Sequence, residues 1–162
     1  MGNDLIHDTS SNITADQAVS GIRALPWLDA RTARLICLIT TRLADLHPEV
    51  LAVILFGSVA RHDERPLADS EPSDVDLLLL VEQRLPEERA LAIHHTLGET
   101  AHTFGYAPRD VQPLLVERDL AGWDPLFVEN VARDGILLWA RGPLPVPLAA
   151  VAARTSSRSA SS

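Results

Sequence analysis

Two apolar runs constrain the fold of this chain more than any other feature of its sequence. Residues 50–56 are apolar without interruption, and residues 77–81 are a second such run inside a predicted strand at 75–81. Runs of this length without alternating polar residues indicate strands that are covered on both faces. The first run stops at Gly57 and the second is preceded by a polar, proline-containing stretch. The sequence therefore predicts a sheet core with helices on both sides.

The other elements follow from helical spacing and from further short apolar runs. Within the helix expected at 86–104, we expect Leu91, His95 and Leu97 to face inward. Pro113 favours an edge position for the third strand, because proline cannot donate a ladder hydrogen bond. The predicted class is α/β (α+β), a small mixed β-sheet packed against helices. The expected helices are 14–25, 29–46, 86–104 and 125–133, and the expected strands are 50–56, 75–81, 110–116 and 135–140.

The predicted organisation is one domain with two disordered ends. Residues 1–13 are polar and irregular, residues 14–141 hold all the expected elements, and residues 142–162 are rich in proline, alanine and serine. No early apolar run reaches the length of a signal segment or a membrane span. We therefore expect a soluble, cytoplasmic protein without a membrane partner.

Charge and residue usage exclude several classes of function. The formal net charge is −8, which argues against DNA or RNA as a partner because phosphate backbones are bound by clustered cations. All 14 basic residues are arginine, so mechanisms that need a phosphate-loop lysine or a Schiff-base lysine are excluded. The single cysteine, Cys37, lies in a helical pattern and is expected to pack as a small hydrophobe.

Two short motifs carry the chemistry. Gly57 follows a buried strand and permits a tight turn, and Ser58 can begin a helix whose N–H groups and hydroxyl hold phosphate oxygens. Asp74 and Asp76 project to the same face of a strand because side chains alternate with a period of two. Two adjacent carboxylates are stable there mainly beside a divalent cation, and this oxygen-rich pair suits Mg²⁺.

Two further residues fit the same chemistry. A two-metal site for phosphoryl transfer needs another carboxylate, and Asp110 is the candidate because it opens the third predicted strand. It would also favour deprotonation of the attacking hydroxyl, although a turn residue after Pro108 is an alternative interpretation. Arg61 is a candidate cation for the triphosphate.

The other candidate residues have simpler explanations. An isolated Asp-x-Asp pair can be a solubilising strand start, and only the preceding strand with its Gly57-Ser58 turn favours a metal and nucleotide site. We interpret the histidines of the 86–104 segment as helix-surface residues and the tryptophans as core or rim residues. The histidines are His94, His95 and His102, and the tryptophans are Trp27, Trp123 and Trp139.

These motifs resemble the nucleotidyltransferase superfamily that includes DNA polymerase β, kanamycin nucleotidyltransferase and the minimal nucleotidyltransferases. The family signature is Gly-Ser, often continued as Ala-Arg-Gly, then Ser-Asp-x-Asp-Leu, with a third aspartate on a later strand. The resemblance covers roughly residues 35–139, and the end of that range looks like the terminal helix and strand of the family. The matching residues are Gly57, Ser58, Ala60, Arg61, Ser73, Asp74, Asp76 and Leu77.

The resemblance implies a specific reaction. Asp74, Asp76 and Asp110 would hold Mg²⁺ in a two-metal site, Gly57, Ser58, Arg61 and Ser73 would bind the nucleotide, and the products would be a nucleotidylated acceptor and pyrophosphate. The chain departs from the family pattern at His62 and in the long segment 62–73, which contains several acidic residues. That segment either weakens triphosphate binding or recognises the acceptor.

The acceptor is open to three interpretations. Minimal relatives commonly pair with a separate all-helical protein, and some are antitoxins that transfer AMP from ATP onto a tyrosine of a HEPN-type toxin. This HEPN/MNT-type antitoxin is the leading hypothesis. A homodimer that adenylylates a small hydroxyl compound, such as an antibiotic, is the second. The third is a non-catalytic antitoxin that binds its partner through the acidic segment.

Overall fold

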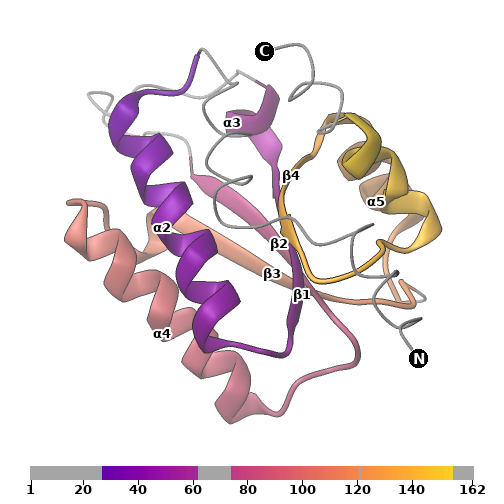
Figure 1. Ribbon diagram of the computed structural model, residues 1–162, viewed down its shortest axis with the longest axis horizontal. Coiled ribbons are helices and arrows are strands. Elements are labelled where there is room, and N and C mark those ends of the chain that lie inside the picture. The colour runs from indigo at the N-terminus through magenta and orange to yellow at the C-terminus, as the bar shows by residue number, and fades with distance from the viewer. Residues whose placement is uncertain (1–26, 62–73, 121, 155–162) are drawn as a thin grey trace, which may run out of the picture.

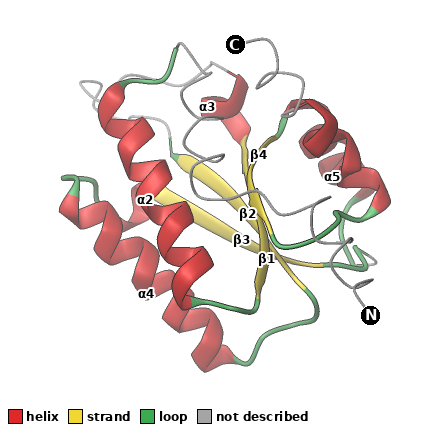
Figure 2. Ribbon diagram, viewed as in Figure 1, coloured by secondary structure: helices red, strands yellow, loops and turns green. Residues whose placement is uncertain are grey.

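The computed structural model describes residues 27–61, 74–120 and 122–154 of the chain. A four-stranded sheet lies at the centre, with α2 and α4 on one side and α5 on the other (Figures 1 and 2). The expected helix at 14–25 and the expected loop at 62–73 lie outside the described residues. The elements are α2 (Ala30–Leu46), β1 (Val50–Phe56), α3 (Gly57–Arg61), β2 (Val75–Val81), α4 (Glu87–Thr103), η2 (Pro108–Asp110), β3 (Val111–Glu117), α5 (Pro125–Asp134), β4 (Ile136–Ala140) and η3 (Val146–Leu148).

The sheet is mixed, with strand order β3-β2-β1-β4. The central strands β1 and β2 are antiparallel, β4 pairs antiparallel with β1, and β3 pairs parallel with β2 through the α4 crossover. Pro113 therefore lies on an edge strand, as predicted, and the mixed α/β fold class is confirmed. The apolar runs of β1 and β2 are buried almost throughout because both faces of these strands are covered.

Two apolar clusters cover the two faces of the sheet. Leu77 and Leu79 of β2 point toward α2 and α4, where Ile39 and Leu97 pack. Leu78, Leu80 and their neighbours point the other way, toward α5. Alternation along β2 places Asp76 on the same face as Leu78 and Leu80, at the end of the strand where that face begins. Asp76, one of the predicted site residues, thus lies on the α5 side of the sheet.

The inward face of α4 differs from the sequence prediction. Leu97 is buried, but Leu91 is 60% exposed and His95 is exposed as well. The helix instead buries Ile93, Leu97 and Ala101, which recur every four residues and form one stripe against the sheet. Leu91 and His95 lie off this stripe, so the prediction for these two residues is wrong.

The segment after β4 also differs from the expected disordered tail. Residues 146–154 are helical, and the side chains of Leu148 and Val151 are buried in the α5-side cluster. Arg154 donates hydrogen bonds to the carbonyl groups of Ala132 and Gly135 at the end of α5. Apolar residues spaced three apart let this proline- and alanine-rich stretch pack on the sheet.

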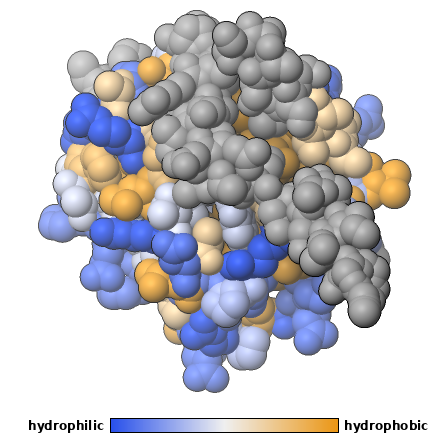
Figure 3. Space-filling view, in the orientation of Figure 1, coloured by the Kyte–Doolittle hydropathy of each residue, from blue (hydrophilic) through white to orange (hydrophobic). Residues whose placement is uncertain are grey.

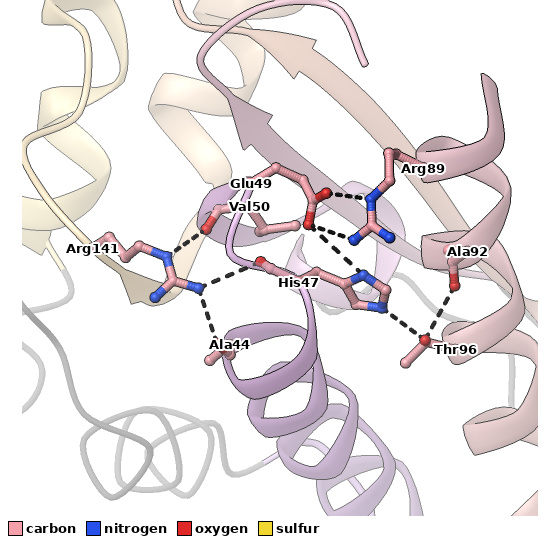
Figure 4. A network of polar contacts seen from close by, with 8 residues as sticks. All are labelled: Ala44, His47, Glu49, Val50, Arg89, Ala92, Thr96 and Arg141. Atoms are coloured by element: carbon pink, nitrogen blue, oxygen red, sulfur yellow. Dashed lines mark hydrogen bonds and ion pairs between the residues drawn. The ribbon is translucent and has the colours of Figure 1, made fainter. Parts of the chain in front are cut away.

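A polar network ties α2, β1, α4 and β4 together at the end of β1 remote from Gly57 (Figure 4). Arg89 of α4 donates to Glu49, and Nε2 of the buried His47 lies 2.8 Å from the hydroxyl of Thr96. Because that hydroxyl donates to the carbonyl of Ala92, the imidazole must be the donor to it. Burial lowers the pKa of His47, although the nearby Glu49 carboxylate opposes this effect.

Hydrophilic residues cover much of the surface around α2 and α4 in the space-filling view (Figure 3). His94, His95 and His102 are all exposed on α4, which confirms their interpretation as surface residues. Trp139 is buried, and Trp27 and Trp123 are partly buried against the two clusters. Among the described residues, no helix has the length and hydrophobicity to cross a membrane.

Candidate active site

The turn at Gly57 brings the end of β1 directly against Asp76. Phe56 pairs with Asp76 in the β1–β2 ladder, so the next residue along β1 must pass the carboxylate. Gly57 has φ +80°, and a Cβ at this position would lie 3.1 Å from Cγ of Asp76 and would overlap Oδ2. Glycine is therefore required both by the left-handed backbone and by the space that the carboxylate occupies.

The environment of Asp76 disfavours the ionised form of its carboxyl group. The pKa of the Asp76 carboxyl is raised to about 6, mainly by burial and also by the negative charge of Asp74, while Arg61 acts in the opposite direction. Asp74 itself is exposed at the start of β2. A divalent cation would neutralise this pair of carboxylates, so the two side chains fit a hard, oxygen-binding metal ion.

Asp110 is the last residue of η2 and directly precedes β3, the strand beside β2, so the strand expected at 110–116 begins one residue later than predicted. Val111 pairs with Val75 in the parallel β2–β3 ladder, so Asp110 and Asp74 precede partnered residues on neighbouring strands. The carboxylate of Asp110 accepts a hydrogen bond of 2.8 Å from the N–H of Ala107 and closes the short η2 turn. Within the described ranges, no three acidic, histidine or cysteine side chains are close enough to form a metal-binding group.

Two of the remaining predicted site residues lie on α3. Ser58 is partly buried in the first turn after Gly57, Arg61 is exposed at the end of the element, and Ser73 lies outside the described residues. Arg61 is close enough to influence the charge of Asp76. The turn and the carboxylate thus meet in space although about twenty residues separate them in the chain.

Two residues near this turn were not assigned to the site from the sequence. The indole N–H of Trp27 donates a hydrogen bond of 2.9 Å to the carbonyl of Val59 and so ties α3 to the segment that precedes α2. Gln112 pairs with Asp76 in the β2–β3 ladder and is exposed beside it. Neither position carries a local sequence signal, because both contacts join segments far apart in the chain.

Comparison with known protein families identifies the family of the domain that contains these residues. Residues 40–143 match the family model described as polymerase beta, nucleotidyltransferase. This region contains the Gly57 turn, both central strands, Asp76 and Asp110. The chain belongs to the polymerase beta nucleotidyltransferase family. It is a nucleotidyltransferase, an enzyme of the transferase class.

Several solved structures are similar to this nucleotidyltransferase at low identity. A toxin-antitoxin structure with AMP-PNP is 19% identical over 76% of this chain and 83% of that chain, with a TM-score of 0.47. A protein from Sulfolobus solfataricus described as a nucleotidyltransferase is 20% identical over 77% and 88%, with a TM-score of 0.43. A tri-AMPylated Shewanella oneidensis HEPN toxin in complex with an MNT antitoxin gives 16% identity over 87% and 84%, with a TM-score of 0.41. No curated protein matches the chain.

A cavity of about 260 Å³ opens beside the Gly57 turn of the nucleotidyltransferase. Phe56 and Gly57 form one side of it, and α5 supplies the other side. The rings of Phe56 and Phe127 meet edge to face, with centroids 5.6 Å apart. A larger depression of about 1140 Å³ lies over α2 and α4, but its lining includes none of the predicted site residues. The smaller cavity is therefore the one that belongs to the site.

Proposed function

We propose that this nucleotidyltransferase moves a nucleoside monophosphate, AMP from ATP, onto a hydroxyl acceptor with the help of Mg²⁺. The observation that carries the proposal is the contact of the Gly57 turn with the partly buried carboxylate of Asp76. A turn that excludes any side chain lets phosphate oxygens approach the backbone. The carboxylate beside it is the kind of ligand that holds Mg²⁺.

The proposed reaction defines which groups the residues have to bind. The acceptor oxygen forms a bond with the α-phosphorus, the bridging P–O bond breaks, and its electron pair leaves with pyrophosphate. Gly57, Ser58, Arg61 and Ser73 bind the phosphates, and Asp74 and Asp76 hold Mg²⁺. When bound, the metal polarises the phosphates and offsets their charge. The whole process releases one proton, from the acceptor hydroxyl.

Asp110 is proposed as the third carboxylate and as the group that favours loss of that proton. Its position directly before β3, beside the start of β2, supports this role. Its carboxylate now accepts from the N–H of Ala107, so it must turn from η2 toward Asp74 to take part. In ligand-free enzymes, the hydrogen bonds of catalytic groups often reach their active geometry only when the substrate binds.

The proposed acceptor is a hydroxyl group on a separate all-helical partner protein, in the manner of a cytoplasmic HEPN/MNT-type antitoxin. This part of the proposal extends the motif resemblance of Gly57-Ser58 and Asp74-Val75-Asp76 to the minimal nucleotidyltransferases. Mass spectrometry of a co-expressed helical partner tests it. Added AMP mass supports the proposal, and binding without added mass would favour the non-catalytic alternative.

The test of the site itself is nucleotide binding measured by calorimetry. We expect the wild-type protein to bind ATP in the presence of Mg²⁺ and Asp76→Asn to lose this binding, because the amide cannot neutralise the metal. Asp110→Asn should instead keep nucleotide binding and lose transfer by several orders of magnitude, roughly 10²–10⁴-fold from the proton-transfer contribution alone. Equal binding by wild type and Asp76→Asn, with or without Mg²⁺, would contradict the proposed site.

A further inference from the structure

Positively charged side chains line the cavity beside Gly57. Arg61 of α3 and Arg133 of α5 both line it, together with the carboxylate of Asp134. Two guanidinium groups therefore face a single carboxylate in a protein whose net charge is −8. Gly57 both lines this cavity and lies directly against the carboxylate of Asp76.

Asp134 holds the Arg133 guanidinium in a two-point contact. Nε of Arg133 donates to Oδ1 at 3.2 Å and Nη2 donates to Oδ2 at 2.9 Å. Adjacent residues on a helix normally point apart, so this arrangement folds the long arginine side chain back over the end of α5. The hydrogen bond from Arg133 lowers the pKa of Asp134, and the charges of Arg61 and Arg154 lower it further. Three arginines thus surround this one carboxylate.

The walls of the cavity strengthen the effect of these charges on an anion. Phe56 and Phe127 line it with aromatic carbon, and Val131 adds an aliphatic side. Low-dielectric walls focus the field of nearby charges, so guanidinium groups above them attract an anion more strongly than isolated surface arginines do. Guanidinium groups also match the geometry of phosphate oxygens.

We propose that this cavity is the subsite for the terminal phosphates of the nucleotide and for the pyrophosphate that leaves, and that Arg133 is a phosphate-binding residue. The inference rests on the proposed function, which places the α-phosphate near Asp76 and the next phosphates at Gly57. A triphosphate that continues past Gly57 enters the cavity between Arg61 and Arg133. When the bridging P–O bond breaks, its electron pair stays on pyrophosphate, and the two guanidinium groups stabilise the added charge. Asp134 is a positioning residue that holds Arg133 in place before the nucleotide binds.

An ordinary structural role for Arg133 makes a different prediction. A cation in the last turn of a helix stabilises the helix through its dipole, and Arg133 meets that description. In that case its loss would change the free energy of unfolding and leave nucleotide affinity as it was. A phosphate-binding role changes the affinity for ATP and pyrophosphate, while AMP, which lacks the terminal phosphates, is unaffected.

The experiment is calorimetric titration of the full chain with ATP, AMP and inorganic pyrophosphate, each in the presence of Mg²⁺. We expect Arg133→Gln to weaken the binding of ATP and pyrophosphate about tenfold and to leave AMP affinity within about twofold. Arg133→Lys should fall between, because it keeps the charge and loses the two-pronged geometry. Arg118→Gln is the matched control, since Arg118 makes a similar surface ion pair, at 3.4 Å from Glu82, outside the cavity lining.

The outcomes separate this inference from the function on which it rests. If the wild-type protein binds ATP and Arg133→Gln binds it equally well, the subsite is wrong and the nucleotidyltransferase proposal stands. An equal loss of ATP affinity in Arg118→Gln would also overturn the inference, because it would show an effect of net charge alone. If the wild-type protein binds neither ATP nor pyrophosphate, both proposals fall.

Discussion

At the scale of single residues, Gly57 and Asp76 constrain each other. The positive φ of Gly57 turns the chain out of β1, and the missing side chain leaves space for the carboxylate of Asp76. The carboxylate is thereby kept partly buried beside Asp74, which raises its pKa to about 6, mainly through burial. A protein with such an unfavourable charge has, without the cation, a lower free energy of unfolding than a variant with a neutral side chain at the same position.

Asp76→Asn is therefore expected to stabilise the metal-free protein at neutral and alkaline pH. The raised pKa means that the folded state holds the proton more tightly than the unfolded chain, so Asp76 destabilises the fold as pH rises from 3.8 to about 6. The full shift corresponds to about 3 kcal/mol, and we expect about 1 kcal/mol because the side chain is partly exposed. Urea unfolding in EDTA at pH 8 and pH 4 measures it, with the gain present at pH 8 and absent at pH 4.

The control for this measurement is Asp74→Asn. The Asp74 side chain is exposed, so its replacement removes the same formal charge with less change in solvation. A gain at pH 8 that is equal in the two variants would show that only the net charge matters. A gain from Asp76→Asn that persists at pH 4 would show that its titration is not the cause.

At the scale of elements, Arg141 joins three parts of the chain at the end of the sheet opposite the site (Figure 4). Its guanidinium donates to the carbonyls of Ala44 at 2.9 Å and Val50 at 3.0 Å, and more weakly to that of His47 at 3.4 Å. It also lies 4.5 Å from the centre of the Trp139 ring. One side chain thus satisfies carbonyl groups at the end of α2 and fixes the turn into β1.

Arg141→Met is expected to lower the free energy of unfolding by about 1–2 kcal/mol. Methionine keeps much of the contact with Trp139 but leaves the carbonyls of α2 without the donor, and hydrogen bonds from charged donors contribute about this much. Thermal or urea unfolding measures the change. Arg118→Met is the control, because the contacts of the Arg118 side chain with Glu82 and Pro143 are exposed and at the limit of hydrogen-bond distance. Equal effects of the two substitutions would contradict the role given to Arg141.

At the scale of the whole molecule, the sheet is stabilised from both sides, and the second side depends on residues beyond the last strand. Leu148 and Val151 are buried in the cluster that contains α5. Arg154 donates to carbonyls at the end of α5 and ties the same segment to the helix that lines the proposed site. We therefore propose that the folding unit extends to residue 154 and not to residue 141.

A chain shortened after residue 142 is expected to be less stable than one shortened after residue 154. Loss of the two buried side chains removes about 3–6 kcal/mol of burial free energy, at roughly 1.5–3 kcal/mol for each. Urea unfolding of the two truncated proteins, compared with the full chain, measures the difference. Stability that is unchanged by removal of residues 143–154 would show that this segment is not part of the folding unit.

The sequence by itself determined the central strands, the three helices and two strands around them that were expected within the described residues, and the acidic pair. Unbroken apolar runs appear at β1 and β2 because both faces of these strands are buried, and the alternation around Asp74 and Asp76 is a property of any strand. The Gly57 turn could be predicted for the same reason, since a break between a buried strand and a helix start is a local pattern.

Only the tertiary structure decided which distant residues meet. Arg133 and Arg61 line one cavity although 72 positions separate them, and Trp27 braces α3 across 32 positions. The exposed position of Leu91 and the burial of Leu148 and Val151 likewise depend on how helices sit on the sheet. Local patterns determine whether a segment forms a helix or a strand, because they set the period of its side chains. Packing between elements determines which face the segment buries and which residues its long side chains contact, and a single segment does not encode that packing.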